Sequence, residues 1–578
     1  MTLARHAETR FTNMTLLASP SSRMPLRALT IAFASALLLA GPAAASPAAG
    51  RDLPPVCATS CVAAKAGTGA LFLFSGHGWG HGIGMSQYGA WGYALHGYGY
   101  QQILSHYYPG TTLGTTPATL IRVLLADGKK TLKLSCTVPF TVTDANGVTD
   151  ALPAGSISLG TKLVVNGQPL MPPLTFDAGA GGWMTLARAY RGQIQVDVAN
   201  GRLRAINVVG LEDYLYGVVP AEMPSTWSPP ALQAQAVASR SYALATRKVA
   251  APFDVYGDTR SQMYLGVSHE TPATNAAVDA TKGQVAMFNG KVASTFFFSS
   301  SGGETESISD GWGVAPVPYL VAVPDPYDVL SPYHNWTVPI SAHTFAQALK
   351  VKGSILDLQT ATDPAGRVSR LSVITLPSLG LGAAAGPSFS GGAVSGALGL
   401  RSTWFSVSMM SLQQPQPAAP IPFGTSITLT GLVRGIAGVS LEERVYGGKW
   451  GLVGPVTPAA DGSLLLPEAP AIMTDYRLAI PSTAVGYVRV RVAPLVQPAD
   501  PTPGQVSGTV QPALPGAPVE VDVQNPDLTW TAIVTSAVDP DGTFVLPVDI
   551  PAGTTYRIVV TPGQGFSPGM SVPQVSAG

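Results

Sequence analysis

Charged side chains are scarce in this chain of 578 residues. Only 11% of the residues are charged, whereas an average soluble domain has about 25%. The 33 basic residues balance the 33 acidic ones, so the formal net charge is zero. This balance gives no electrostatic basis for binding nucleic acid or an anionic membrane surface. We therefore expect no nucleic acid as a partner.

Cysteine is also scarce, with three residues in the chain. Three are too few for a domain that is held together by disulfides. Cys57 and Cys61 are close enough in sequence to pair, and a bond from either of them to Cys136 is equally open. The three cysteines are not spaced as metal ligands, and the sequence predicts no cofactor.

Long hydrophobic runs are missing except near the N-terminus. Residues 28–41 (ALTIAFASALLLAG) form an apolar run that is too short for the ~20 residues of a membrane-spanning helix. Two arginines precede the run, and the small residues 43–46 (AAAS) follow it. This order is typical of an export signal, so we expect a signal peptide over residues 1–48, with Met24 as an alternative start. The mature protein is then expected to be secreted or wall-located, with no integral membrane segment.

Apolar residues make up 46% of the chain, and Gly and Pro together about a fifth. This composition indicates folded, loop-rich β structure. We expect residues 70–410 to form an α+β, predominantly β catalytic-type domain with one principal helix. The alternating runs 193–198 and 202–208 flank Asn200-Gly201, which is typical of a hairpin.

Two helices are expected after this hairpin. Residues 211–218 (LEDYLYGV) have acidic residues in what would be a first turn. The principal helix begins after Ser228, a residue type that caps helices, followed by two prolines. It is rich in alanine and is expected to run to about Lys248.

The C-terminal part contains an internal repeat. A Pro-rich linker at 411–423 precedes two expected modules, residues 424–497 and 504–578. Short alternating runs with an Asp-Gly turn predict small all-β, sandwich-like modules. They serve either as spacers or as carbohydrate-binding surfaces through exposed aromatics. The matched positions, 80 residues apart, are Trp450 and Trp530, Asp461-Gly462 and Asp541-Gly542, and Tyr476-Arg477 and Tyr556-Arg557.

Glycine alternates with bulky residues at the start of the segment 76–90 (GHGWGHGIGMSQYGA). Alternate glycines permit a positive φ and a close approach of the backbone to a ligand or to another strand. In a strand, His77, Trp79 and His81 would point to one face, which would suit a sugar ring. No third metal ligand is near the two histidines. The alternative is a tight packing motif whose histidines are hydrogen-bonded.

Glu222 lies between two prolines, in an apolar stretch just ahead of the principal helix. Burial would disfavour the charged carboxylate and raise the pKa of Glu222, and no Lys or Arg near it in sequence would oppose this rise. A carboxylic acid that stays protonated near neutral pH can act as a general acid. A capping or surface glutamate is the alternative. On the following helix, Gln235 and Arg240 lie on different sides.

A third stretch combines hydroxyls and glycines. The expected strand 296–298 runs into Ser299 and the residues SSGGE. Such an end can present backbone N–H groups at the rim of a cleft, and an ordinary Ser/Gly-rich turn is the alternative. The chain lacks a G-x-S-x-G elbow here, which disfavours a serine hydrolase. In a strand, Gln262 and Tyr264 would face one way and offer polar contacts to a ligand.

Several stretches between residues 70 and 410 together resemble the stage II sporulation protein D (SpoIID)/LytB domain family. They are residues 76–90 with 100–111, 215–242, 254–266, the SSSGGETES stretch and 400–407. The resemblance implies peptidoglycan as the substrate class. One branch of the family consists of lytic transglycosylases that act on glycan strands stripped of stem peptides. Another branch was described as enhancers of a wall amidase.

The resemblance also assigns roles to residues. The family's catalytic acid matches Glu222 in VVPAEMP. Gln235 and Arg240 match polar positions of the following helix. The Ser-Gly-Gly loop of the family matches Ser299, Gly302 and Gly303.

Two departures from the family pattern have consequences. The GHGWGHG string precedes the other motifs here, whereas in the family it follows LRSTWF, so the domain is expected to be circularly permuted. Permutation is tolerated when the termini lie close together, so residues 74–84 should lie beside residues 401–407. Family members with zinc carry cysteines in the stretch that matches 254–262, and this chain has none there, so we expect no zinc site.

The leading interpretation is a secreted lytic transglycosylase-like enzyme with Glu222 as the general acid and base. Glu304 and Asp258 are the acids that would have to approach it in space if a second carboxylate were used. The rival is a non-catalytic amidase enhancer or wall-binding module; a purely structural wall protein would leave residues 70–410 without a role. The expected substrate contacts are Gln235, Arg240, Gln262, Tyr264, Ser299, Gly302, Gly303, His77, Trp79 and His81.

Overall fold

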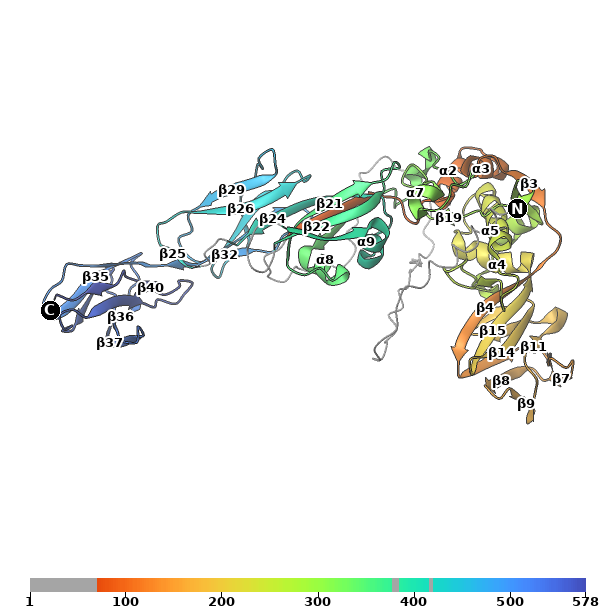
Figure 1. Cartoon of the computed structure of the whole chain (residues 1–578), viewed down its shortest axis with the longest axis horizontal. Helices are drawn as coiled ribbons and strands as arrows, with labels where there is room; N and C mark the ends of the chain where they lie inside the picture. Colours follow the sequence, from red (N-terminus) through yellow and green to blue (C-terminus); the bar gives the residue numbers. More distant parts are fainter. Residues whose placement is uncertain (1–69, 377–383, 415–418, 578) are drawn as a thin grey trace, which may run out of the picture. The chain divides into compact units, whose positions relative to one another are not determined.

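The computed structural model describes residues 70–376, 384–414 and 419–577 (Figure 1). The expected signal peptide, with Cys57 and Cys61, lies outside the described residues. Strands predominate over helices, as expected for a β-rich chain that contains some helix. Among the described residues, no helix is both long and apolar enough to cross a membrane.

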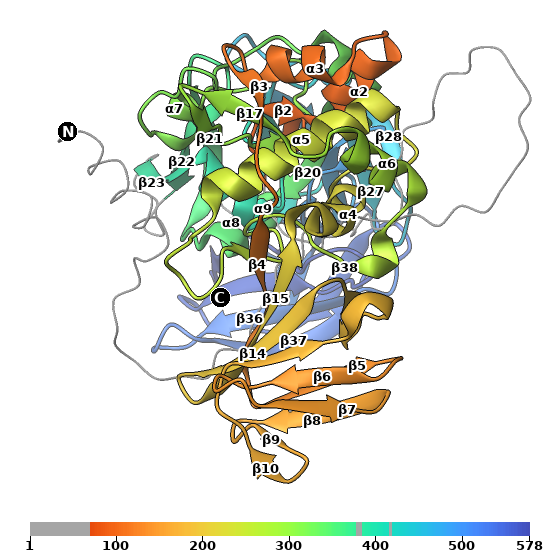
Figure 2. The same ribbon diagram turned by 90° about the vertical axis from the view of Figure 1, so that its right-hand side faces the viewer.

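A seven-stranded sheet forms the first large core. Its centre is the hairpin of β14 (Gln193–Ala199) and β15 (Arg202–Gly210), which Figure 2 shows side by side. Asn200 and Gly201 have φ values of 51° and 68°, so the turn has the left-handed conformation that its residues favour. This confirms the predicted hairpin. The sheet order is β16 (Val255–Tyr256), β4 (Leu120–Lys129), β15, β14, β11 (Leu174–Asp177), β6 (Phe140–Thr143) and β7 (Thr149–Leu152).

A four-stranded sheet packs into the same core, with the order β13 (Arg188–Tyr190), β12 (Met184–Leu186), β5 (Thr131–Cys136) and β8 (Gly155–Gly160). Cys136 ends β5, is buried, and forms no disulfide within the described part of the chain. Its burial among aliphatic side chains indicates a packing role for this cysteine.

Two helices follow the hairpin directly. Helix α4 (Leu211–Glu222) is longer than the expected 211–218, and its last residue is Glu222. Met223 is extended because the residue before a proline, here Pro224, is disfavoured in the helical region, and this ends α4. Helix α5 (Pro229–Thr246) is the principal helix. Ser228 occupies its N-cap position, but its side chain makes no capping hydrogen bond, contrary to the expectation.

Another helical layer packs against α5. It contains α2 (Gln87–Leu95) and α3 (Tyr100–Tyr107), which share an apolar core with buried residues of α5. Ser86 caps α2 by accepting a hydrogen bond from the amide of Gly89. The short strand β2 (Met85–Ser86) pairs in parallel with β19 (Phe297–Phe298). This pairing brings the first glycine-rich motif next to the serine-rich one.

The N-terminal strand β1 (Leu71–His77) lies between two strands from far along the chain, β20 (Asn335–Ser341) and β24 (Phe405–Gln413). Phe74 pairs with Val407, and the carbonyl of Arg401 accepts a hydrogen bond from the Gly80 amide. Residues 74–84 therefore do lie beside residues 401–407, as predicted. Circular permutation of the domain stays a prediction.

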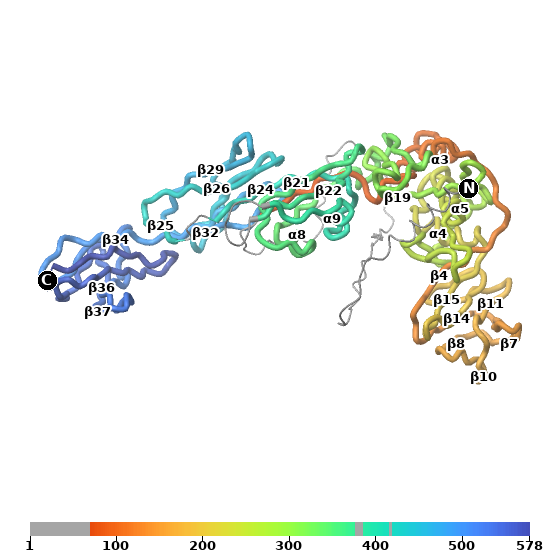
Figure 3. Tube along the Cα trace, in the orientation of Figure 1, coloured from red at the N-terminus to blue at the C-terminus, as the bar shows by residue number. Residues whose placement is uncertain are grey.

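A three-stranded sheet follows β20 in the chain, formed by β21 (Ser354–Thr362), β22 (Val368–Leu376) and β23 (Ala384–Ser390). Helices α8 (Ala342–Leu349) and α9 (Gly391–Leu398) lie beside this sheet (Figure 3). Their residues Phe345 and Val394 belong to its apolar core.

The sheet of β1 continues into the C-terminal part of the chain. Strand β24 also pairs with β26 (Ile427–Arg434), which pairs with β29 (Ser463–Glu468). The linker expected at 411–423 therefore overlaps the end of β24 and all of β25 (Ile421–Pro422), and residues 415–418 lie outside the described part.

The two expected C-terminal modules contain corresponding contacts. The guanidinium of Arg477 lies 4.1 Å from the ring centre of Trp450, and that of Arg557 lies 4.4 Å from Trp530. The aspartates of the two Asp-Gly turns each accept hydrogen bonds from the amide and hydroxyl two residues later. Each module also buries one tyrosine. The conspicuous tryptophans therefore have arginine partners on their rings.

Candidate active site

Glu222, at the end of α4, is partly buried. Its Oε1 accepts a hydrogen bond of 2.6 Å from the amide of Met263. Burial raises the pKa of Glu222 to about 7, and the Met263 hydrogen bond opposes this rise only in part. Among the described residues, no Lys, Arg or His forms an ion pair with Glu222. The carboxyl group is thus neither paired with a guanidinium nor fully in solvent.

Gln87 connects the first motif to Glu222. Its Nε2 donates to the carbonyl oxygen of Glu222 at 3.0 Å and to Oε1 of Gln235 at 3.3 Å. The Nε2 of Gln235 donates in turn to Ser239. Gln87 was not among the predicted site residues, although it lies within the GMSQYGA string. Because its two partners are 135 and 148 residues away, only the fold reveals this contact.

Arg240 is completely buried. Its Nε donates to Glu212 at 2.9 Å, and its Nη1 donates to the carbonyl oxygen of Gln284 at 3.0 Å. Glu212 lies in the first turn of α4, as expected, and the ion pair joins α4 to α5. Gln235 is also completely buried. Both residues therefore bind protein groups and have no exposed surface, so neither can contact a substrate directly in this structure.

Gln262 and Tyr264 do not lie in a strand, since residues 262–266 have no regular secondary structure. Tyr264 is buried, and its hydroxyl donates to Asn207 at 2.8 Å. Gln262 is also buried, and its Nε2 donates to the carbonyl of Ser239. Its Oε1 is buried without a hydrogen-bond partner. The two side chains therefore do not form one exposed polar face.

The expectation that His77, Trp79 and His81 share one strand face is wrong. Strand β1 ends at His77, and the glycines at 78, 80, 82 and 84 all have positive φ values. These left-handed glycines turn the backbone at every second residue, so the alternation of a strand cannot continue.

The three side chains of this string have separate environments. The ring of His77 lies 4.9 Å from that of Trp404, and the ring of Trp79 lies 4.4 Å from that of Tyr333. His81 lies beside Phe298 and accepts a hydrogen bond from the Ile83 amide. Burial lowers the pKa of His81 to about 4, so its imidazole is neutral near pH 7.

The glycines of the string have tight neighbours. A Cβ at Gly78 would lie 2.5 Å from the carbonyl oxygen of Ser300, and one at Gly84 would lie 2.1 Å from that of Phe296. The glycines thus permit close approach to another backbone segment, one of the two roles that the sequence left open.

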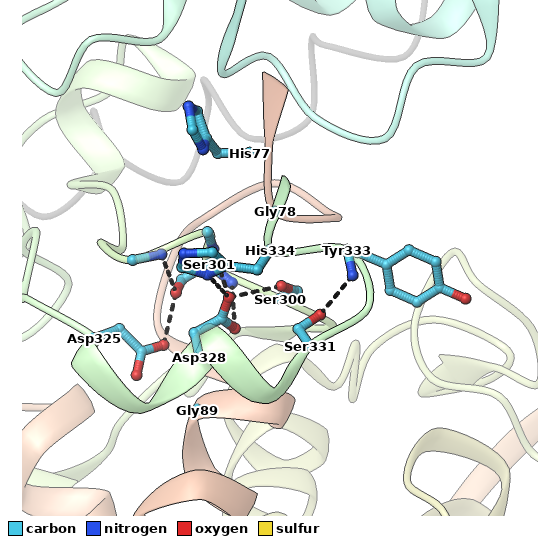
Figure 4. A network of polar contacts seen from close by, with 12 residues as sticks. His77, Gly78, Gly89, Ser300, Ser301, Asp325, Asp328, Ser331, Tyr333 and His334 are labelled. Carbon is cyan, nitrogen blue, oxygen red and sulfur yellow. Dashed lines mark hydrogen bonds and ion pairs between the residues drawn. The ribbon is translucent and has the colours of Figure 1, made fainter. Parts of the chain in front are cut away.

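The Ser-Gly-Gly loop is held by a buried aspartate that the sequence did not indicate. Asp328 accepts hydrogen bonds from the amides of Ser301 and Gly302 at 3.0 and 2.9 Å (Figure 4). It also accepts from the hydroxyls of Ser86 and Ser300. The Gly302 amide is therefore already bonded, contrary to the expectation that such groups line a cleft rim.

The remaining members of the loop are also held by protein groups. The Gly303 amide donates to the Ser301 hydroxyl, and the carbonyl of Ser299 accepts from the Tyr88 amide. Nδ1 of His334 lies 3.1 Å from Asp328. A second buried aspartate, Asp325, accepts from Ser301 and Tyr107. Burial raises the pKa of Asp325 to about 6.

The acids considered as second carboxylates do not hydrogen-bond to Glu222. Asp258 forms an ion pair of 2.6 Å with Arg260, whose hydrogen bond lowers the pKa of Asp258. A hollow of about 530 Å³ lies beside Asp258 and includes Tyr264, but Glu222 is not among its lining residues. Within the described ranges, no three His, Cys, Asp or Glu side chains form a group that could hold a metal ion.

The chain segment that contains α4 and α5 matches a known protein family. Residues 199–288 match the family model of the stage II sporulation protein SpoIID. This range includes α4, α5 and Glu222. The chain therefore carries a domain of the SpoIID/LytB family, as its motifs indicated.

Three curated relatives extend this comparison. The chain is 40% identical over 127 residues to the amidase enhancer of Bacillus subtilis, covering 22% of this chain and 17% of that protein. It is 33% identical over 176 residues to the stage II sporulation protein D of Bacillus subtilis, covering 28% and 51%. It is 39% identical over 137 residues to an uncharacterized protein of Brachyspira hyodysenteriae, covering 23% and 37%. The chain thus matches about half or less of each relative's length.

Two solved structures that match this chain have low TM-scores. A cytokine receptor complex matches with a TM-score of 0.18 at 16% identity, covering 29% of this chain and 96% of that one. A tetra-tandem repeat of a large adhesion protein matches with a TM-score of 0.16 at 11% identity, covering 79% and 99%. These scores are too low to support an argument about fold or function.

Proposed function

We propose that this protein acts on the bacterial cell wall as a secreted, peptidoglycan-cleaving enzyme of the lytic transglycosylase type. The domain match and the relatives named stage II sporulation protein D and amidase enhancer support a cell-wall role. The observation that carries the enzymatic proposal is the carboxyl group of Glu222. It is partly buried, unpaired with any described cation, and has a pKa of about 7.

The proposed reaction needs only one carboxyl group. Protonated Glu222 donates its proton to the glycosidic oxygen while the bond from that oxygen to C1 of muramic acid breaks. The C6 hydroxyl of the same sugar then attacks the oxocarbenium-like C1, and the Glu222 carboxylate takes up the hydroxyl proton. The product has a 1,6-anhydro end, and Glu222 is protonated again.

This mechanism fits the absence of a second acid bonded to Glu222 among the described residues. A glycosidase that uses water ordinarily has two carboxylates at a defined separation. General-acid assistance of this kind contributes about 10²–10⁴ to the rate. The protonated fraction of Glu222 falls above pH 7, so we expect cleavage to slow as the pH rises through this value.

The test is mass spectrometry of the products from intact peptidoglycan and from peptidoglycan stripped of stem peptides. Wild type should release anhydro-muramic fragments, and Glu222→Gln should lose about 10²-fold or more of this activity. Asp310→Asn is the matched control, because Asp310 is an exposed carboxylate of the same domain. Equal anhydro release by wild type and Glu222→Gln would refute the assignment.

An amidase enhancer or wall-binding module is the second candidate. It is favoured by the relative of that name and by the fact that Glu222 is not among the residues lining the hollow beside Asp258. In that case no anhydro products form, and the full chain accelerates a cell-wall amidase to the same extent with and without Glu222→Gln.

A further inference from the structure

Five partly exposed aromatic rings form a continuous row, which we call the aromatic string. Successive ring centres are 4.4 Å apart for Trp79 and Tyr333, 6.2 Å for Tyr333 and Tyr88, and 4.9 Å for Tyr88 and Trp227. Trp91 ends the row, stacked on Trp227 at 4.9 Å with an interplanar angle of 7°. All five side chains are neither buried nor fully exposed.

The aromatic string is attached to the segment that carries Glu222. Tyr88 and Trp91 are one turn apart on α2, and Tyr88 directly follows Gln87, which binds the Glu222 carbonyl. Trp227 lies in the connection between α4 and α5, shortly after Glu222. Two separate contacts thus fix the string next to the chain segment of the proposed acid.

The polar atoms of the aromatic string are unused within the protein. None of the two tyrosine hydroxyls and three indole N–H groups hydrogen-bonds to any described residue, and none is among the buried polar atoms without a partner. All five groups therefore reach solvent. Elsewhere in the domain, Tyr100, Tyr107 and Tyr264 bond their hydroxyls to protein groups.

Arg401 adds a positive charge beside Tyr333, the second ring of the aromatic string. Its guanidinium lies 5.3 Å from the ring centre of Tyr333 and forms no hydrogen bond or ion pair with any described side chain or backbone group. By contrast, Arg240 and Arg260 are paired with carboxylates. Figure 4 shows the ring of Tyr333 pointing away from the Asp328 network, although its neighbour His334 is anchored there.

We propose that the aromatic string binds the glycan strand on which Glu222 acts, and that Arg401 binds a carboxylate of that strand. The inference rests on the proposed peptidoglycan function and names the residues that hold the substrate. Aromatic rings with free polar edges suit amino sugars, because the C–H faces of a sugar pack on the rings while its hydroxyl and acetamido groups bond to the edges. Muramic acid without a stem peptide supplies the free carboxylate that a planar, unpaired guanidinium recognises.

Binding can be measured without cleavage in the Glu222→Gln background. The probes are an uncharged hexamer of N-acetylglucosamine and glycan strands stripped of stem peptides, titrated by calorimetry against the full chain. Trp91→Ala and Tyr333→Ala should each weaken binding of both probes about tenfold. Arg401→Gln should weaken binding of the stripped strands about tenfold and leave the hexamer unchanged.

Two variants control for loss of structure. Trp183→Ala removes a tryptophan that is 47% exposed and lies outside the aromatic string, and it should bind both probes like the background protein. Trp91→Phe keeps a ring for stacking on Trp227 but lacks the indole N–H, so it should retain more affinity than Trp91→Ala. An equal loss in Trp183→Ala, or no difference between the two Trp91 variants and the background, would overturn the inference.

The binding and cleavage results separate the two proposals. If wild type cleaves and all variants of the aromatic string bind the glycan normally, the enzyme proposal stands and glycan binding by the aromatic string is rejected. If the string variants weaken glycan binding but no protein yields anhydro products, glycan binding by the aromatic string stands and the enzyme proposal is rejected. Loss of amidase stimulation with unchanged glycan binding would assign the string to a protein partner and reject the inference.

Discussion

The raised pKa of Glu222 makes a prediction about stability that does not depend on catalysis. The pKa rises from 4.5 to about 7 in the folded protein, so the folded state holds the proton more tightly between these values. The free energy of unfolding therefore falls as the pH increases through this window. Glu222→Gln removes this titration, while the amide oxygen of Gln can still accept the Met263 hydrogen bond.

The size of the effect follows from the two pKa values. At about 1.36 kcal/mol per pKa unit, the full rise corresponds to about 3 kcal/mol. Because Glu222 is partly exposed, screening by solvent reduces this value, and we expect about 1–3 kcal/mol. The stability of Glu222→Gln minus that of wild type should therefore be about 1–3 kcal/mol larger at pH 8 than at pH 5.

Urea unfolding of both proteins at pH 5 and pH 8 measures this change. Taking the difference between the two proteins cancels the titration of every other group. Asp310→Asn is the control, because it removes an exposed carboxylate. A difference between wild type and Glu222→Gln that is the same at both pH values, or that favours wild type at pH 8, would refute the proposed environment of Glu222.

Two other predictions concern the segments around the site. Gly84→Ala should be far more destabilising than Gly97→Ala: both glycines have φ above +75°, but a Cβ at Gly84 would lie 2.1 Å from the Phe296 carbonyl and one at Gly97 meets nothing within 4 Å. Thermal unfolding should show about 1–2 kcal/mol for Gly97→Ala and at least twice that for Gly84→Ala, and equal losses would argue against the close approach. Asp328→Asn should cost about 2–4 kcal/mol, because an amide group replaces an oxygen that accepts several buried donors; a variant as stable as wild type would contradict the network.

Local features of the sequence were predictable. The hairpin around Asn200-Gly201 and the helix α5 depend on turn residues, prolines and alanines that act within a few positions. The pKa of Glu222 was also predictable, because the absence of nearby cations and the apolar flanks are both visible in the sequence. Its place at the end of α4 was not predicted, because the helix was expected to end at residue 218, whereas it continues through Pro220 to Glu222.

The long-range contacts of the site were not predictable. Asp328 is 242 residues from Ser86, and nothing in the local sequence of either residue indicates the other. The string of histidines and glycines was misread because an alternating pattern is also what a strand would have. In the structure these glycines have positive φ values. A pattern of alternating glycines could equally indicate close packing between strands, so the sequence alone could not show which applies.

The glycine-rich motif acts on Glu222 through the backbone. Because Gly84 has no Cβ, its segment approaches the Phe296 carbonyl closely enough for β2 to pair with β19. That pairing sets the start of α2, where Gln87 donates to the carbonyl of Glu222. This carbonyl is in the last turn of α4, where carbonyl groups have no partner within the helix. Gln87 thus supplies a hydrogen bond that the helix end lacks, and this physically connects the glycines of one motif to the carboxyl-bearing residue of the other.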